Sequence, residues 1–240
     1  MKRINLQLCS IKEETNKDFE RALEKVAEMG YSGVEFAGFN DIPAGKMKEM
    51  LSNNGLDAPS AHVGLGLLNS ELDSQIEYLN ELGARYIICP SADIRNTESA
   101  LEYAEKFSII GEKCKAAGLT FGYHNHAHEF LPDNKKYPMD VLFENVDSRL
   151  VTMEPDLFWL AYAGLDPIEY ITKNKARISI LHLKQIENMT TKLNVDAQDG
   201  IIDFKRAMEI CGTAEFVYEQ EEFTGLPINS VRRSAKYFTW

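Results

Sequence analysis

The chain has 240 residues, of which 44% are hydrophobic and 10% aromatic, a composition typical of a folded protein with a sizeable core. Its 26 basic and 37 acidic residues give a formal net charge of −11, and a field of this sign disfavours nucleic acid and anionic membranes as partners. The four cysteines form no C-x-x-C pair, which argues against a disulfide framework and a thiolate metal site and fits a reducing cytoplasm.

The first residues, MKRINLQLCSIKEE, begin with a basic pair, as secretory signals do. The apolar run that follows contains Asn and Gln and ends in charged residues, whereas a signal peptide needs about 7 to 15 apolar residues. No later segment approaches the roughly 18 consecutive apolar residues of a transmembrane helix. We therefore expect a cytoplasmic protein without a membrane span.

A short β-rich run followed by an amphipathic run recurs along the whole chain. The expected strand and helix pairs are 4–10 with 18–30, 33–39 with 43–55, 58–65 with 71–83, 86–91 with 98–118, 120–130 with 138–146, 151–159 with 166–175, 178–184 with 203–212, and 215–223 with 228–238. Eight such units predict an α/β fold, a single-domain (β/α)8 TIM barrel over residues 1–240. A doubly wound open sheet is disfavoured, because the chain has no G-x-G-x-x-G or Walker sequence.

The stretch GYHNHAHEF at 122–130 holds three of the five histidines of the chain. If this stretch is extended, His124, His126 and His128 point to one face. Active sites of such barrels form at the C-terminal ends of the strands, so this face is a candidate site. Ionisable residues also stand near the ends of the other strands: Glu35, His62, Glu154, Asp156, His182, Lys184, Glu219 and Glu221.

The strands from the fifth to the eighth each carry a residue type that binds divalent cations. We expect His124, Asp156, His182 and Glu219 to hold one metal with positions left open for substrate oxygens. Such a metal would act as a Lewis acid, while a neighbouring carboxylate moves a proton on the adjacent carbon. Lys184 would stabilise an enediolate oxygen, and Trp159 would offer an apolar face to a sugar ring.

Several motifs occur together in this chain: YHNH followed by EF, E-x-D before an aromatic pair, HLK, a strand-eight EQ-E, and the stretches LQLCS, GYSGVEFAGF and GIIDF. Together they resemble the xylose-isomerase-like barrels, and more narrowly their sugar phosphate isomerase/epimerase branch. The resemblance implies a barrel with one divalent metal (Mn2+, Co2+ or Zn2+). Its members isomerise, epimerise or dehydrate sugars, keto-sugars and inositol derivatives, so it also implies a small-molecule carbohydrate substrate.

The resemblance also implies roles for individual residues. Many relatives have a glutamate where this chain has His124, and the chain departs from the family again at Gln185 and at VDAQDG, 195–200. The resemblance implies metal ligation by Asp156, His182 and Glu219, with His124 as the simplest match for the strand-five ligand, and catalysis by Glu219. From the residues themselves we expect Glu154 and Lys184 to take part in catalysis, and we expect substrate binding by Glu35, His62, His126, Trp159 and Glu221.

Alternatives to these roles stay open at this point. A surface position is favoured for His128, and a core or rim position for Trp159. Glu154 is open to a second role as a buried partner of Arg or Lys, and a solvated side chain is the less favoured alternative for Lys184. A lyase or dehydratase acting on a keto-sugar or inosose, and an idle sugar-binding subunit, compete with the isomerase or epimerase. An abasic-site endonuclease is disfavoured by the acidic surface. The aromatic tail KYFTW is a candidate contact of a homo-oligomer.

Overall fold

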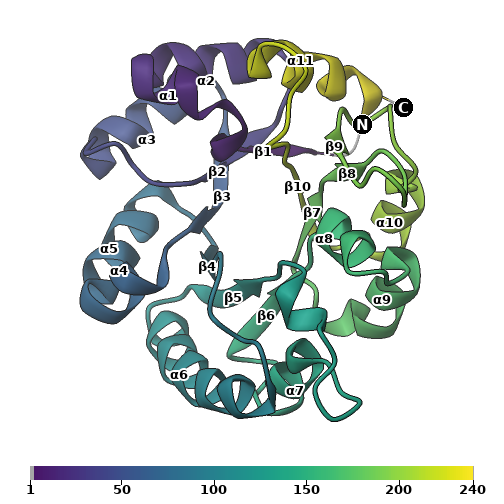
Figure 1. Ribbon diagram of the computed structural model, residues 1–240. Helices are drawn as coiled ribbons and strands as arrows, with labels where there is room; N and C mark the ends of the chain where they lie inside the picture. Colours follow the sequence, from purple (N-terminus) through teal and green to yellow (C-terminus); the bar gives the residue numbers. More distant parts are fainter. Residues whose placement is uncertain (1–2, 240) are drawn as a thin grey trace.

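The structure, a computed structural model, describes residues 3–239, and in it eight parallel strands form a nearly closed barrel with the helices outside (Figure 1). The barrel strands are β1 Asn5–Gln7, β2 Gly33–Phe36, β3 Asp57–His62, β4 Tyr86–Cys89, β5 Thr120–His124, β6 Val151–Glu154, β7 Ile180–Leu183 and β10 Glu215–Tyr218. Neighbouring strands follow the order β6-β5-β4-β3-β2-β1-β10-β7. Two isolated parallel bridges, Met153 with Ile178 and Asp156 with His182, join β6 to β7. The predicted barrel is confirmed.

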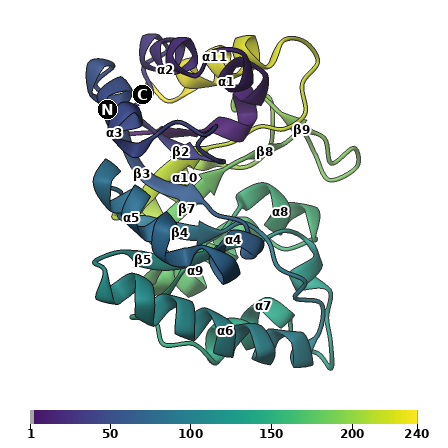
Figure 2. The same cartoon turned by 90° about the vertical axis from the view of Figure 1, so that its left-hand side faces the viewer.

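The helices surround the barrel on its outside (Figures 1 and 2). They are α1 Lys12–Lys17, α2 Phe19–Glu28, α3 Ala44–Asn53, α4 Leu65–Ser70, α5 Leu72–Leu82, α6 Thr97–Ala116, α7 Pro138–Glu144, α8 Leu157–Tyr162, α9 Pro167–Asn174, α10 Phe204–Ile210 and α11 Pro227–Tyr237. None of the helices within residues 3–239 combines the length and the apolar character that a membrane crossing requires.

Helix α2 shows how the sequence pattern produces these elements. Phe19 and Leu23 lie four residues apart on one face and are buried against the barrel. The side chain of Asp18 accepts a hydrogen bond from the backbone N–H of Arg21 and so caps the first turn. Gly30 follows the helix with a φ of 92°, a left-handed conformation that glycine adopts without strain and that ends the helix.

Inside the barrel, a layer of apolar side chains is followed by a layer of polar side chains towards the C-terminal ends of the strands. Ile88, Ile180 and Val217 pack together inside the barrel. A Cβ on Gly122 would lie 2.5 Å from Ile88 Cδ1, so the absence of a side chain there lets β5 approach its neighbour. Because side chains alternate along a strand, the residue two positions after an inward apolar one also points inward. His182 follows Ile180 in this way and lies in the polar layer.

The strands are shorter than predicted, and this changes the geometry of the histidine-rich stretch. β5 ends at His124, and the chain then turns into a 3-10 helix at His128–Phe130. The expectation that His124, His126 and His128 share one strand face is therefore wrong. The chain also forms an antiparallel hairpin of β8 (Gln185–Ile186) and β9 (Asn194–Val195) that was not predicted.

The aromatic tail packs on its own chain. Phe238 is buried, with its ring centroid 6.0 Å from that of Phe204 and 5.7 Å from that of Tyr218. Trp240, the last residue of the proposed oligomer contact, lies outside the described residues. At Phe238 the tail thus contributes to the core rather than to an exposed patch.

Candidate functional site

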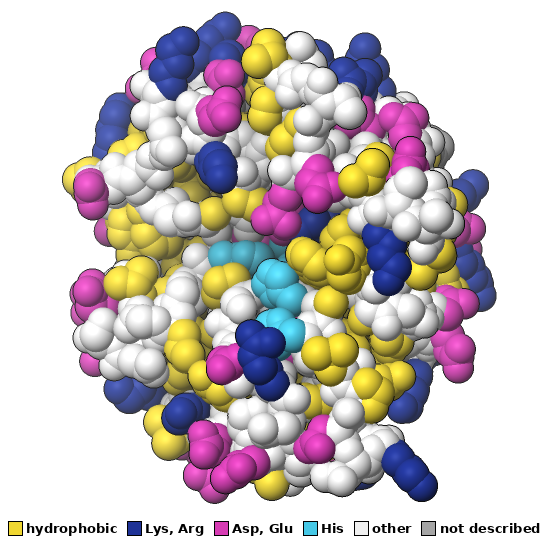
Figure 3. Space-filling view, viewed as in Figure 1, with side chains coloured by type: hydrophobic (Ala, Val, Ile, Leu, Met, Phe, Trp, Pro, Cys, Tyr) yellow, Lys and Arg dark blue, Asp and Glu magenta, His cyan; other side chains and the backbone are white. Residues whose placement is uncertain are grey.

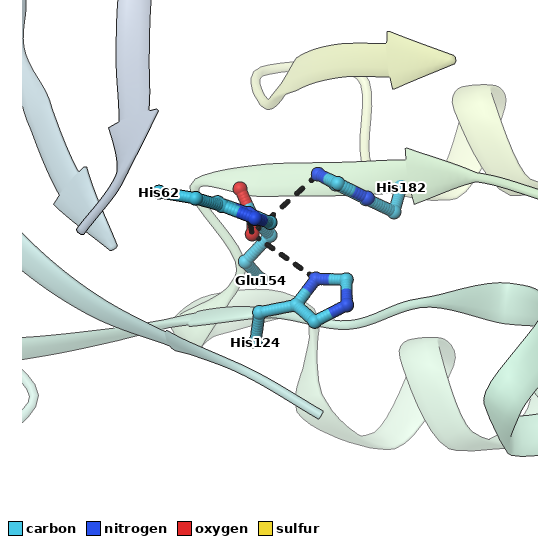
Figure 4. Close-up of side chains that lie close together, drawn as sticks. All are labelled: His62, His124, Glu154 and His182. Carbon is cyan, nitrogen blue, oxygen red and sulfur yellow. Dashed lines mark hydrogen bonds and ion pairs between the residues drawn. The ribbon is translucent and has the colours of Figure 1, made fainter. Parts of the chain in front are cut away.

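Two carboxylates and three imidazoles meet in the polar layer at the C-terminal ends of the strands. We call the five the inner group, and Figure 4 shows how four of them face one another. They are Glu35 on β2, His62 on β3, His124 on β5, Glu154 on β6 and His182 on β7. Glu35 and Glu154 are fully buried, so the paired imidazoles offset the cost of removing these charges from water.

The hydrogen bonds of the inner group orient the imidazole rings. Glu154 Oε2 lies 2.7 Å from His62 Nε2 and 3.1 Å from His124 Nδ1 (Figure 4). Glu35 Oε2 lies 2.8 Å from His182 Nε2. A carboxylate at one ring nitrogen accepts its N–H and leaves the other nitrogen free to bind elsewhere. His124 therefore presents Nε2, and His182 presents Nδ1, to a second set of residues.

We call the four predicted metal ligands the outer group: His124, Asp156, His182 and Glu219. His124 and His182 thus belong to both groups, through opposite nitrogens of their rings. One ligand atom from each lies within 4.8 Å of all the others. Asp156 Oδ2 is 3.8 Å from His124 Nε2, and Glu219 Oε2 is 2.9 Å from His182 Nδ1.

Asp156 Oδ2 is buried without a hydrogen-bond partner, and the buried His182 Nδ1, although it lies 2.9 Å from Glu219 Oε2, has no hydrogen bond of suitable geometry. Buried polar atoms without partners are rare, and two of them facing mixed imidazole and carboxylate donors fit a divalent cation. The outer group is therefore one of two sets among the described residues that could hold a metal; the other is His62, His124, Glu154 and His182 of the inner group.

The titration behaviour of this group follows from its burial. Burial raises the pKa of Asp156 to about 7, although the positive charge of Lys184 acts to lower it. Burial, with the charge of His182, lowers the pKa of His124 to about 3, so this ring is neutral at neutral pH. For His182 burial is outweighed by the carboxylates of Glu154 and Glu35, which hold its pKa well above the ordinary value. A bound cation would displace that proton, as metal binding to such sites does.

Lys184 lies beside the outer group and is buried. Its Nζ is 2.9 Å from Glu219 Oε1, contacts Glu221, and lies 5.1 Å from the centre of the Trp159 ring. Burial disfavours its charge, but Glu219 and Asp156 raise its pKa above the usual value. The alternative of a solvated lysine is therefore wrong, and a fixed positive charge stands at the edge of the site.

His126 and Trp159 lie beside the outer group and are partly exposed. The two rings lie 5.2 Å apart, and His126 Nδ1 and Trp159 Nε1 are buried without a hydrogen-bond partner. In the space-filling view, histidines lie at the bottom of a hollow in the centre of this face (Figure 3). The ring of His128 points to the backbone instead, with its Nε2 2.9 Å from the carbonyl oxygen of Ala92. Its side chain is 20% exposed.

Two glutamates near the site differ in their partners. The ion-pair partners of Glu154 are imidazoles, so the alternative in which it pairs with Arg or Lys is wrong. Glu129, the nearest glutamate after β5, accepts hydrogen bonds from the Tyr123 hydroxyl and the backbone of His126 instead of entering the cluster. His124 is thus the residue that β5 contributes to the outer group.

Several supporting residues were not identified from the sequence. Gln7 donates to Glu35 Oε2 over 2.7 Å. Asn194 Oδ1 accepts the backbone N–H of Glu221 over 2.7 Å, which fixes the start of the loop after β10. Gln185 was noted only as a departure from the family, yet its buried side chain donates to the carbonyl oxygens of Ala197 and Ile202. Such partners are invisible in sequence because they lie far apart along the chain.

A family model described as xylose isomerase-like TIM barrel matches residues 23–216. Among curated relatives, an inosose dehydratase of Geobacillus kaustophilus is 25% identical over 79% of this chain and 68% of the relative. One of Geobacillus thermodenitrificans is 24% identical over 85% of this chain and 82% of the relative. A solved sugar phosphate isomerase/epimerase of Parabacteroides distasonis is 26% identical, covers 99% of this chain and 97% of that one, and superposes with a TM-score of 0.85. All three relatives are enzymes, in agreement with the prediction of an enzyme.

Proposed function

Since this chain belongs to the xylose isomerase-like TIM barrel family, we propose that it is a metal-dependent isomerase or epimerase of a sugar or keto-sugar. It would work by proton transfer next to a carbonyl. The observation that carries the proposal is the outer group, in which His124, Asp156 and His182 meet Glu219 within 4.8 Å. The full coverage of the Parabacteroides enzyme supports the same assignment.

The outer group would hold one divalent metal, Mn2+, Co2+ or Zn2+. Two carboxylates and two imidazoles are a donor set that suits these ions. When bound, the metal would polarise a carbonyl or hydroxyl oxygen of the substrate as a Lewis acid.

The residues beside the outer group would carry the proton transfer. Burial opposes the charge of Glu219, but Lys184 and His182 hold its pKa well below the usual value, so this carboxylate is ionised and can accept a proton. Lys184 would stabilise negative charge that develops on the substrate oxygen. Glu221, which is half exposed and contacts Lys184, would bind a substrate hydroxyl.

The remaining predicted residues would bind or position rather than transfer protons. The rings of His126 and Trp159 are partly exposed, and each carries a buried nitrogen without a partner to which a substrate hydroxyl would bind. Glu154, which we predicted as catalytic, is fully buried among His62, His124 and His182 and has no surface that a substrate could reach. We therefore assign Glu154, with Glu35, the role of orienting the imidazoles.

A dehydratase is the second candidate, favoured by the inosose dehydratase relatives. It would begin with the same proton abstraction and continue with loss of a hydroxyl group from the next carbon. An idle sugar-binding subunit would keep the pocket but move no proton. The three alternatives thus differ in what happens to one carbon-bound hydrogen and one hydroxyl group.

Proton transfer can be measured directly by NMR. Metal-loaded protein would be incubated in D2O with a panel that includes 2-keto-myo-inositol and keto-hexoses. Deuterium at the carbon next to the carbonyl with a new epimer or isomer supports the first proposal, and a dehydrated product supports the second. Binding without any deuterium incorporation would contradict both, and Glu219→Gln is the control that removes the proposed base.

A further inference from the structure

A groove opens beside the inner group on the side of β2 and β3. Its cavity has a volume of about 470 Å3 and is lined by His62, by the loop at 38–43 and by residues of α4 and α5. In the space-filling view the central hollow continues from the histidines to the left, between the upper and lower parts of this face (Figure 3). This volume is within the range of about 300 to 1,000 Å3 that small-molecule sites occupy.

One wall of the groove is apolar and fixed in place. The rings of Phe39 and Tyr78 stack with their centroids 4.0 Å apart. The Tyr78 hydroxyl donates to the carbonyl oxygen of Ile42 over 2.7 Å, which ties α5 to the loop after β2. Leu67 of α4 extends this wall and is 42% exposed. Flat apolar surface of this kind suits the faces of a ring.

The rim of the groove is polar and lacks positive charge. Asn40, Asp41, Glu71 and Gln75 supply carboxylate and amide groups that can bind hydroxyl groups. Among the described residues that line it, none is Lys or Arg. Because phosphate sites need cations or clustered backbone N–H donors, this rim favours a neutral ligand rich in hydroxyl groups.

His62 connects this groove to the candidate site. Its ring lines the groove, while its Nε2 lies 2.7 Å from Glu154 and 3.1 Å from Glu35. We propose that the groove holds the second ring of a two-ring substrate, a glycoside without phosphate, while the keto-sugar ring lies at the outer group. This inference rests on the proposed function, and it narrows the substrate class from sugars in general to keto-glycosides.

The test compares a one-ring probe with two-ring probes of the same keto-sugar. Dissociation constants would be measured by calorimetry on metal-loaded protein with 3-keto-glucose and with both anomers of its phenyl glycoside. Two variants alter the groove: Phe39→Ala removes a ring, and Leu67→Trp fills space from an exposed position. Tyr103→Ala removes a partly exposed ring on the outer helix α6 and is the matched control. Thermal unfolding would check that each variant is folded.

We expect the wild type to bind one phenyl glycoside about two- to tenfold more tightly than 3-keto-glucose, from the energy of an aromatic contact. Phe39→Ala and Leu67→Trp should abolish this preference and leave 3-keto-glucose binding unchanged, and Tyr103→Ala should change neither. Equal binding of one-ring and two-ring probes by the wild type would overturn the groove proposal alone. If Leu67→Trp keeps the preference, the groove proposal is overturned as well. If the wild type binds none of the probes, the groove proposal is overturned, whereas the proposed function is decided separately by the deuterium experiment.

Discussion

Replacing Glu154 by Gln should weaken metal binding although Glu154 belongs to the inner group and is not a predicted ligand. The carboxylate accepts hydrogen bonds from His62 over 2.7 Å and from His124 over 3.1 Å, and it is fully buried. The amide keeps the shape but loses the charge, and it keeps a single acceptor oxygen for the two rings. His124 is then free to turn its Nε2 away from the outer group.

Loss of such a partner typically reduces metal affinity by about 10- to 100-fold, which is roughly 1.4 to 2.7 kcal/mol. The dissociation constant for Mn2+ or Zn2+ would be measured by competition with a chelator of known affinity. Glu129→Gln is the matched control, because Glu129 is also fully buried but binds Tyr123 and the backbone of His126. If Glu154→Gln binds metal within twofold of the wild type, or if both variants lose affinity equally, the positioning argument is refuted.

Three further predictions test other parts of the account. Lys184→Met should lower kcat by about 100-fold or more with a smaller change in KM, because it removes a charge needed in the transition state. An unchanged kcat in steady-state kinetics would contradict this role of Lys184. Gly200→Ala should destabilise the fold by about 1 to 3 kcal/mol in urea unfolding, because its Cβ would lie 2.3 Å from a backbone oxygen, whereas Gly212→Ala, with no atom closer than 3.6 Å, should not. Burial opposes ionisation of Asp196, but hydrogen bonds from a neighbouring amide, hydroxyl and guanidinium lower its pKa. Its stabilisation should therefore be complete above about pH 4 and be lost as pH falls through the folded-state pKa, and Asp196→Asn should remove that part of the acid dependence.

The barrel and the outer group could be predicted because both depend on short-range patterns. Eight alternations of β-rich and amphipathic runs require eight strand–helix units, and parallel strands bring their C-terminal ends to one face. A period of two places His182 and Lys184, and likewise Glu219 and Glu221, on the same side of a strand. Those residues do meet, because Lys184 contacts both glutamates.

What could not be predicted depends on contacts across the closed barrel. Glu35 and His182 are hydrogen-bonded although 147 positions separate them, and no local pattern marks that pair. The end of β5 at His124 is set by its pairing with β6, which also ends at that level, at Glu154. The β8–β9 hairpin is held by Asn194, which donates across the hairpin to the carbonyl oxygen of Gln185, and by Gln185, which donates to the carbonyl oxygen of Ile202 in a loop that the sequence pattern leaves unassigned.

The central claim is that the outer group binds one divalent metal, and elemental analysis tests it most directly. Protein purified without chelator would be compared with the variants Asp156→Ala and His182→Ala after their folding has been checked by circular dichroism. We expect about one manganese, cobalt or zinc per chain in the wild type and none in either variant. A wild type that contains no metal and takes up none from added Mn2+, Co2+ or Zn2+ would contradict it, as would variants that keep the full metal content.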